Sequence, residues 1–503
     1  MQPIAPYFRR PVHHLPQRVP HARASFPPGS LAPLQVAQAY SLRKFGSGRG
    51  VKLGIVSLGG AVSMADVTGA CQAWGIPVPT VNVVTTDGST PVADPGGADT
   101  ENMLDVLLTA ATWYYCTGTA AQIEVAIAPN SGTGIADSTN RLVADGCETI
   151  SISWGAPEQQ WATSDRTVTE QAFAAALAKG VSVFAASGDN SEDDGTNTPT
   201  CDYPCGSARV WAIGGTALTL NPDGTIASEK AWGDGLPGDE GGGGGYDLVT
   251  ARPGWQQGVV PSGNNGKGCP DSSANADPNT GWQILDGGAW GVVGGTSASC
   301  PFTAAYVAAC KSQVPAGTIS VLGPTLYGAQ ATAWHDITTG SNGAPSTVGW
   351  DPATGLGSPN GPGLAQALLG GGSQPPSPPA TATVPSLIAM TWLAAKQALA
   401  GVNLTIAPVQ TSTPSALVVA QSPGAGAVLP VGSTVTVTLG TVPNPQPDPV
   451  VAREEKFIAI VMGAVPPQWR AVVGALLIRY VNRQSNLTAA QKAELVAYIQ
   501  SLE

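Results

Sequence analysis

The stretch VSVFAASGD, residues 181–189, is a short and mostly apolar run that ends in a glycine and a carboxylate. Three further runs have a similar character: VKLGIVSLGG (51–60), QIEVAIAP (122–129) and TISISWG (149–155). Segments with helical patterns alternate with them: TENMLDVLLTAATW (100–113), TEQAFAAALAKG (169–180) and CPFTAAYVAACKSQ (300–313). This alternation predicts an α/β fold with a mostly parallel sheet and helices on both of its faces.

Two Pro-rich stretches divide the rest of the chain. GGGSQPPSPPATAT (370–383) and PNPQPDP (443–449) are compositions typical of linkers. We therefore expect six segments in order: a basic, Pro-rich arm (1–30), the main α/β domain (31–371), a linker (372–383), a small α+β domain (384–441), a second linker (442–449) and a helical C-terminal domain (450–503).

Composition and charge narrow the function classes. The formal net charge of −11 argues against nucleic-acid binding by the main body. The first thirty residues contain arginines and repeated prolines and no apolar core segment, so neither a signal peptide nor a membrane span is expected. Eight cysteines match no paired CxxC zinc pattern. Cys201 and Cys205 either form a small disulfide loop or remain free buried thiols.

One serine is placed like a nucleophile. In GGTSASCPFTAA (294–305), Ser297 follows a Gly-Gly-Thr turn and opens a helix, where backbone N–H groups and the helix dipole favour developing negative charge. An ordinary capped helix is the alternative. Of the four histidines, three lie in the N-terminal arm and the fourth, His335, stands beside Asp336. A Ser-His-Asp triad is therefore not expected.

Carboxylates are the alternative base. Glu101 and Asp105 stand four residues apart on the helix of residues 100–113, so both side chains project from one face and can share a proton. The alternative is a solvated helix face. Asp189 follows the apolar strand 181–186, at the strand end where open α/β sheets build their sites, and a protonated Asp there can donate a hydrogen bond to an oxyanion.

The serine in GGTS, the Glu-x-x-x-Asp helix and SGD after a strand together resemble the sedolisin family of serine-carboxyl peptidases, and in particular its kumamolisin-like branch. The resemblance runs from PLQVAQAYSL (33–42) to ALLGG (367–371). It implies a subtilisin-like fold and four catalytic roles: nucleophile Ser297, general base Glu101, proton-relay partner Asp105 and oxyanion-stabilising acid Asp189. It also implies that the strand segment Ser153, Trp154 and Gly155 binds substrate.

The same resemblance implies one structural Ca²⁺ ion. HDITTG (335–340) and GWDPATGLGSP (349–359) look like the family's calcium loop. The implied ligands are the carboxylates of Asp336 and Asp351 and the carbonyls of Ile337, Thr347 and Gly349, and hard oxygen ligands suit this ion. One departure is Ser57, which stands where close relatives carry an acidic residue. We expect the absence of this acidic side chain to alter the proton relay and the pH optimum.

The segment from VPSLIAMTWLAAKQAL (384–399) to GSTVTVTL (432–439) resembles a PASTA module, whose members bind peptidoglycan fragments or act as spacers. The tail from Val450 has helical patterns, including a Thr488 to Gln491 capping box. We expect these C-terminal modules to dock on a cell-wall or virion-protein partner, in an extracellular or virion-associated setting. The leading hypothesis is an endopeptidase for protein or peptide substrates. The alternative is a non-catalytic structural or adhesin component on a peptidase fold.

Overall fold

The computed structural model describes residues 26–502 apart from 28, 96, 195, 197–198, 234–239, 263–264, 371–380, 401, 403, 409–416, 431–433, 441–448, 467–469 and 485–486. The chain divides into two compact units, Met1–Pro379 and Ala380–Glu503. Most of the expected arm 1–30 and of the linkers 372–383 and 442–449 lies outside the described residues.

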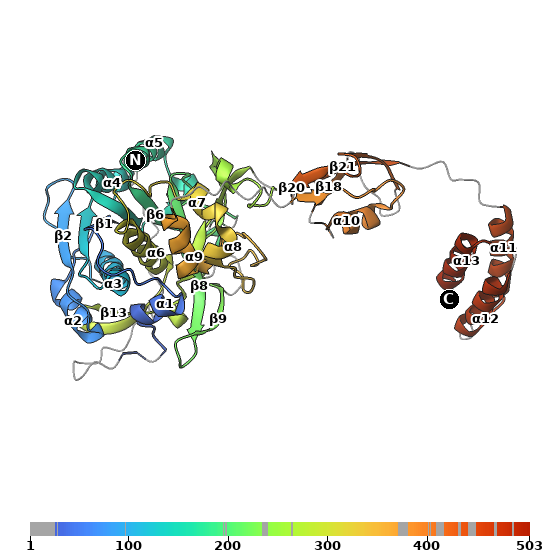
Figure 1. Ribbon diagram of the computed structural model, residues 1–503, viewed down its shortest axis with the longest axis horizontal. Coiled ribbons are helices and arrows are strands. Elements are labelled where there is room, and N and C mark those ends of the chain that lie inside the picture. The colour runs from blue at the N-terminus through green and yellow to red at the C-terminus, as the bar shows by residue number, and fades with distance from the viewer. Residues whose placement is uncertain are drawn as a thin grey trace. The chain divides into compact units, whose positions relative to one another are not determined.

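The first unit is built on an eight-stranded sheet (Figure 1). Its strand order is β12-β8-β6-β4-β1-β3-β2, all paired in parallel, and β9 adds to β8 in antiparallel. The bounds are β1 Lys52–Ser57, β2 Thr80–Thr85, β3 Gln122–Ile127, β4 Cys147–Ile152, β6 Ser182–Ala186, β8 Val210–Leu220, β9 Ile226–Ala231 and β12 Ser272–Asn275.

Alternate residues of the strands point to opposite faces of the sheet and pack into two separate hydrophobic clusters. Ile55 and Phe184 belong to one hydrophobic cluster, and their neighbours Val56 and Val183 belong to the other. Helices α3 (Ala98–Thr117) and α6 (Thr296–Lys311) supply the first cluster, and α4 (Gly134–Ala144) and α5 (Thr163–Ala178) supply the second. The sheet is therefore covered on both faces, as the sequence predicts.

Helix α6 has no solvent-exposed side. Each of its sixteen residues is buried, from Thr296 to Lys311, and most of them are small. It packs against α3 and against several strands of the sheet, which places Ser297 inside the unit rather than at its surface.

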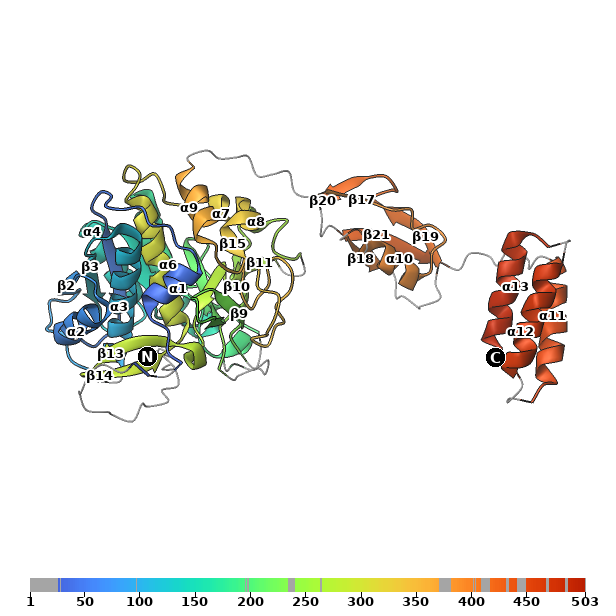
Figure 2. The ribbon, with the colours of Figure 1, turned by 60° about the horizontal axis from the view of Figure 1, so that its bottom comes forward.

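Shorter elements complete the first unit (Figure 2). The helices are α1 Pro33–Ala39, α2 Met64–Trp74, α7 Gly323–Gly328, α8 Gln330–Ala333 and α9 Gly361–Leu369, with 3-10 turns at Glu158–Gln160, Ser191–Asp193, Gly254–Gln256 and Pro278–Thr280. Two-stranded ribbons pair β5 Ala156–Pro157 with β7 Asp202–Tyr203, β10 Gly245–Ala251 with β11 Gly266–Cys269, β13 Trp282–Asp286 with β14 Ala289–Val293, and β15 Trp334–His335 with β16 Ser358–Pro359.

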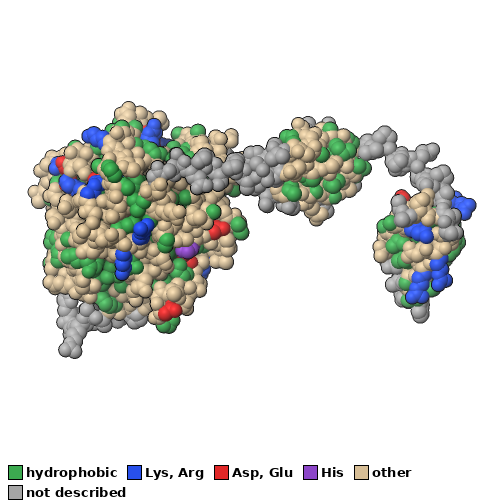
Figure 3. Space-filling view, in the orientation of Figure 1, with side chains coloured by type: hydrophobic (Ala, Val, Ile, Leu, Met, Phe, Trp, Pro, Cys, Tyr) green, Lys and Arg blue, Asp and Glu red, His purple; other side chains and the backbone are tan. Residues whose placement is uncertain are grey.

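The second unit contains two separate hydrophobic clusters. The first lies among α10 (Trp392–Ala400) and the sheet β18-β21-β19 (Thr405–Pro408, Thr434–Gly440, Leu417–Ser422), and β17 (Thr381–Thr383) pairs with β20 (Val428–Pro430). The second joins three helices: α11 Pro449–Gly463, α12 Arg470–Arg483 and α13 Ala489–Ser501. The Thr488 to Gln491 capping box is present. On the face drawn in Figure 3, Lys and Arg side chains gather on these helices.

Among the described residues, no helix is long and apolar enough to cross a membrane.

Candidate active site

Ser297 lies in the first turn of α6, and a glycine makes this turn possible. Gly295, at the N-cap, has φ +103°, and a Cβ there would lie 2.6 Å from an oxygen of Asp189. Both the backbone conformation and the close approach therefore require glycine. Ser297 is 4% exposed, and its Oγ lies 3.4 Å from the carbonyl oxygen of Ser153. The hydroxyl thus sits at the positive end of a helix dipole.

Glu101 and Asp105 lie one turn apart on α3 and are both buried, at 3% and 0% exposure. The solvated-face alternative is therefore wrong, because α3 packs against α6 at this point. The Ser153 hydroxyl donates a 2.7 Å hydrogen bond to Asp105 and lies 3.3 Å from the Ser297 carbonyl oxygen. One oxygen of each carboxylate, Oε1 of Glu101 and Oδ2 of Asp105, is buried with no hydrogen-bond partner in the described part of the chain.

These carboxyl groups favour their protonated forms. Burial and the neighbouring Asp105 carboxylate raise the pKa of Glu101 well above its ordinary range, and the Ser297 side chain opposes this only in part. Burial also raises the pKa of Asp105, against the lowering effect of its bond from Ser153. Since two buried carboxylates cannot both ionise cheaply, the pair is suited to share a single proton.

Asp189 follows β6 and is held against the start of α6. The Thr296 backbone N–H donates a 2.7 Å hydrogen bond to Asp189 Oδ1, and the Thr296 hydroxyl lies 2.8 Å from the same oxygen. Burial raises the pKa of Asp189 to about 6, although both Thr296 contacts lower it. A protonated Asp189 is therefore available in mildly acid solution, beside the N-terminus of the helix that carries Ser297.

A cleft of about 570 Å³ opens beside this group, and its lining includes Glu101, Leu104, Trp154 and Val293. Of the three residues that the resemblance assigns to substrate binding, Trp154 lines this cleft. Ser153 instead turns its hydroxyl to Asp105, and Gly155 lies close to the backbone of Tyr203 on the neighbouring ribbon. The segment after β4 therefore supplies both the wall of the cleft and a link between the carboxylates and α6.

Ser57 is buried at the end of β1, and its hydroxyl donates a 2.7 Å hydrogen bond to the carbonyl of Gly59. The side-chain amide of Asn102, next to Glu101 on α3, donates to the same carbonyl at 3.0 Å. Ser57 is thus connected to the start of α3 through Gly59 and Asn102.

The two aspartates of the expected calcium loop, Asp336 and Asp351, both accept hydrogen bonds from backbone N–H groups of residues 347–349. The Gly349 N–H donates to Asp336 at 2.9 Å, and the Thr347 N–H donates to Asp351 at 2.9 Å. Burial raises the pKa of Asp351 to about 6 despite bonds from Thr347, Thr354 and Ala353. The carbonyl oxygens of Ile337, Thr347 and Gly349 accept no hydrogen bond from any described residue. Thr347 and Gly349 are exposed, so their carbonyl oxygens are accessible to a cation or to water. Carboxylate and carbonyl oxygens are the ligand types that a hard cation takes.

Sequence reasoning missed two features of this region. The Thr296 anchor of Asp189 carries no sequence signal beyond its place before the serine. In the structure all eight cysteines are buried and none is paired, so Cys201 and Cys205 are free thiols there. These two lie beside Cys269, a partner that cysteine spacing did not reveal.

A parallel sheet of this order, a serine at the N-terminus of a central helix and a buried carboxylate pair in place of histidine define a subtilisin-like domain of the serine-carboxyl type. Residues 110–350 match the subtilase family model, and residues 382–441 match the PASTA domain model. The chain is 38% identical to kumamolisin of Bacillus sp. (strain MN-32) over 367 residues, which cover 69% of this chain and 65% of the relative.

Sedolisin of Pseudomonas sp. (strain 101) is 30% identical over 253 residues, or 46% of this chain and 42% of the relative. A solved structure of Pseudomonas sedolisin, a serine-carboxyl proteinase complexed with pseudo-iodotyrostatin, superposes with a TM-score of 0.60 and 26% identity, covering 68% of this chain and 98% of that chain. The chain thus spans less than two thirds of the length of both curated relatives. Its first unit belongs to the sedolisin family, and its second unit begins with a PASTA domain.

Proposed function

We propose that this protein is a serine-carboxyl endopeptidase that hydrolyses peptide bonds in protein or peptide substrates through an acyl-enzyme on Ser297. The observation that carries the proposal is the buried carboxylate pair of Glu101 and Asp105, joined through Ser153 to the backbone of Ser297. Buried, unsatisfied carboxylates are costly to a fold, and a shared proton beside a serine gives them a chemical use.

The reaction follows from these positions. Glu101 accepts the proton of the Ser297 hydroxyl as Oγ attacks the substrate carbonyl, and Asp105 shares the charge through their coupling. The oxyanion that forms takes a hydrogen bond from protonated Asp189 and lies at the N-terminus of α6. The proton then passes to the leaving amine, and water, activated by the same carboxylate, hydrolyses the acyl-enzyme.

This scheme predicts activity in acid solution. Asp189, whose pKa is about 6, must be protonated, and Glu101 must be able to lose its proton. The test is digestion of casein or a peptide library between about pH 3 and about pH 7. Wild type should cut and Ser297→Ala should not. Ser299→Ala is a matched control, since Ser299 lies on the same helix and bonds to the Gly214 carbonyl. Cleavage by Ser297→Ala would exclude Ser297 as the nucleophile, and no cleavage by wild type would favour the non-catalytic structural role.

We further propose one structural Ca²⁺ ion, held by Asp336, Asp351 and the carbonyls of Ile337, Thr347 and Gly349. The ion would offset the charge of two carboxylates and tie the loop to the end of the first unit. Calcium at a hundred times its Kd adds about 2.7 kcal/mol to the free energy of unfolding. A chelator should therefore lower the melting temperature of wild type by several degrees, and Asp336→Ala should melt low with and without chelator. Identical wild-type melting in both conditions contradicts the proposal.

For the second unit we propose a docking role in an extracellular or virion-associated setting. Two of its helices, α11 and α12, expose large apolar side chains, namely Phe457, Ile460, Val472, Leu476 and Tyr480. A cell-wall or virion protein is the partner class that fits a PASTA domain followed by such helices. Co-sedimentation of the chain with purified cell walls, compared with Ile460→Ser and Leu476→Ser together, tests this role.

A further inference from the structure

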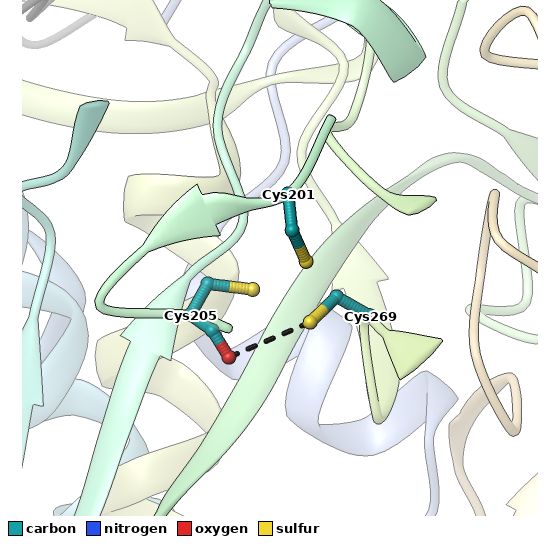
Figure 4. Close-up of side chains that lie close together, drawn as sticks. All are labelled: Cys201, Cys205 and Cys269. Carbon is teal, nitrogen blue, oxygen red and sulfur yellow. Dashed lines mark hydrogen bonds between the residues drawn. The ribbon is translucent and has the colours of Figure 1, made fainter. Parts of the chain in front are cut away.

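Three cysteine side chains converge at a buried point of the first unit that the proposed reaction does not use (Figure 4). The sulfur atoms of Cys201, Cys205 and Cys269 all lie within 4.8 Å of one another, and all three residues are 0% exposed. Cys201 precedes β7, Cys205 lies in the turn that follows it, and Cys269 ends β11. Separate segments of chain therefore aim their thiols at one point.

The spacing suits a metal ion better than a single disulfide. A Zn–S bond of about 2.3 Å places two sulfurs of a tetrahedral site about 3.8 Å apart, which three thiols gathered within 4.8 Å reach with small side-chain rotations. Cys201 and Cys205 have three residues between them, a spacing that zinc ligands use. A disulfide would use two sulfurs at about 2.05 Å and leave the third without a role.

The surroundings supply positive charge. The ammonium of Lys267, itself 0% exposed, donates a 2.8 Å hydrogen bond to the carbonyl of Cys205. The same ammonium pairs with the Asp271 carboxylate at 3.3 Å, so the two side chains together carry no net charge. The ammonium nevertheless lies against Cys205, and an adjacent cation favours a thiolate there.

We propose that Cys201, Cys205 and Cys269 bind one thiophilic metal ion, zinc or copper(I), as three thiolates. Binding releases to water each thiol proton still present, and no oxidant or reductant takes part. Soft sulfur ligands select these ions over calcium, so the site is distinct from the loop of Asp336 and Asp351. Copper(I) is satisfied by three thiolates, whereas zinc requires a fourth ligand.

The ion would brace the wall of the cleft. The Glu158 N–H donates a 3.1 Å hydrogen bond to the carbonyl of Cys201, and β5 pairs with β7 through Ala156 and Tyr203. These elements continue the segment that carries Trp154. Binding therefore ties the Trp154 segment, through β5 and β7, to β11, whether or not the protein is a peptidase.

The experiment uses the full chain, purified, reduced and made metal-free under nitrogen. We expect about one Zn²⁺ or one Cu⁺ per chain by native mass spectrometry, and an ultraviolet thiolate-to-metal band when Cd²⁺ is used as the probe. Each of Cys201→Ala, Cys205→Ala and Cys269→Ala should weaken binding by at least roughly a hundredfold. Cys71→Ala is the matched control, because Cys71 is equally buried and lies outside the cluster. Zinc and copper titrations identify the ion.

Two results overturn the proposal. The first is a wild-type chain, purified under air, whose mass is two hydrogens below that of the reduced chain, because this loss shows a disulfide. Replacing either bonded cysteine would then leave its partner as a titratable thiol, whereas replacing the third cysteine would leave the disulfide intact. Eight titratable thiols in the denatured chain, with no stoichiometric uptake of Zn²⁺, Cu⁺ or Cd²⁺ by the native chain, shows ordinary buried cysteines. The mass difference, the thiol count and the metal uptake are all measured on wild type, so they decide the matter even if a variant fails to fold.

Discussion

The two units of the chain use their interiors differently. The first buries ionisable groups, among them Glu101, Asp105, Glu124 and Lys267. In the second, every buried side chain of the described residues is apolar. Burying a charge costs free energy unless it is paired or neutralised, so a unit that does so repeatedly has given up stability for chemistry. The buried reactive groups are therefore concentrated in the first unit, whereas the described interior of the second unit serves packing alone.

The strongest test of this contrast removes one reactive group from the first unit. Ser297→Ala and Glu101→Ala should each lower kcat/KM by at least about a thousandfold, and the double variant should lose little more, because neither group works without the other. Steady-state kinetics on a chromogenic peptide measures the loss. Glu494→Ala, which removes an exposed carboxylate from α13 in the second unit, should leave kcat/KM unchanged. Additive losses for Ser297 and Glu101 would show that they do not act as a unit.

The next test separates charge from hydrogen bonding at Asp189. Asp189→Ala should lower kcat by about a hundredfold to a thousandfold, since it removes an oxyanion donor. Asp189→Asn keeps both a donor and the acceptor for the Thr296 N–H, so it should retain most of the activity. Its amide does not titrate near neutrality, so the alkaline limb of the pH profile should move to higher pH. If the alkaline limb does not move, the titration that causes it belongs to a group other than Asp189.

A third test uses the pH dependence of stability. The pKa of Asp189 rises from 3.8 to about 6 on folding, so between these values the folded chain holds a proton that the unfolded chain has lost. The free energy of unfolding of the first unit should therefore fall as pH rises through this window, by about 3 kcal/mol from this group. Calorimetry should show this transition shifting while that of the second unit stays constant. Asp189→Asn should flatten the slope, and a first unit that gains stability from pH 4 to pH 6 contradicts the prediction.

The smallest expected effect concerns Ser57. A carboxylate introduced by Ser57→Glu adds negative charge near the start of α3 and should raise the pKa of the Glu101 and Asp105 pair. The acidic limb of kcat/KM should move upward by about one pH unit or less. Ser57→Gln is the neutral control of similar size. An acidic limb that does not move, or that moves downward, places Ser57 outside the proton relay.

Sequence patterns predicted the strands that are apolar on both faces and missed those that are not. β1, β3, β4 and β6 read as apolar runs because both sides of each strand face a core. β12, Ser272–Asn275, is fully buried yet consists of small and mostly polar residues, so hydrophobic periodicity gives no sign of it. Ser272 accepts a hydrogen bond from the Trp211 indole, and Asn275 accepts one from the Leu218 N–H and donates one to the Thr280 carbonyl. Only the folded chain reveals these partners.

The site shows the same division. Ser297, Glu101, Asp105 and Asp189 could be predicted from the sequence because each belongs to a local motif. The bond from Ser153 to Asp105 joins residues far apart in sequence, and so does the approach of Cys269 to Cys201. No local pattern encodes such contacts, because the topology of the sheet creates them.

The complete burial of α6 has a consequence for exchange of its backbone amides with solvent. A helix with an exposed side can fray or open locally, whereas a helix with neighbours on every side exchanges only when the surrounding structure opens. The amide hydrogens of α6 beyond its first turn should therefore be among the slowest of the chain to be replaced by deuterium. Ser297 then keeps its position for as long as the first unit stays folded, and is displaced only when the hydrophobic core around α6 unfolds.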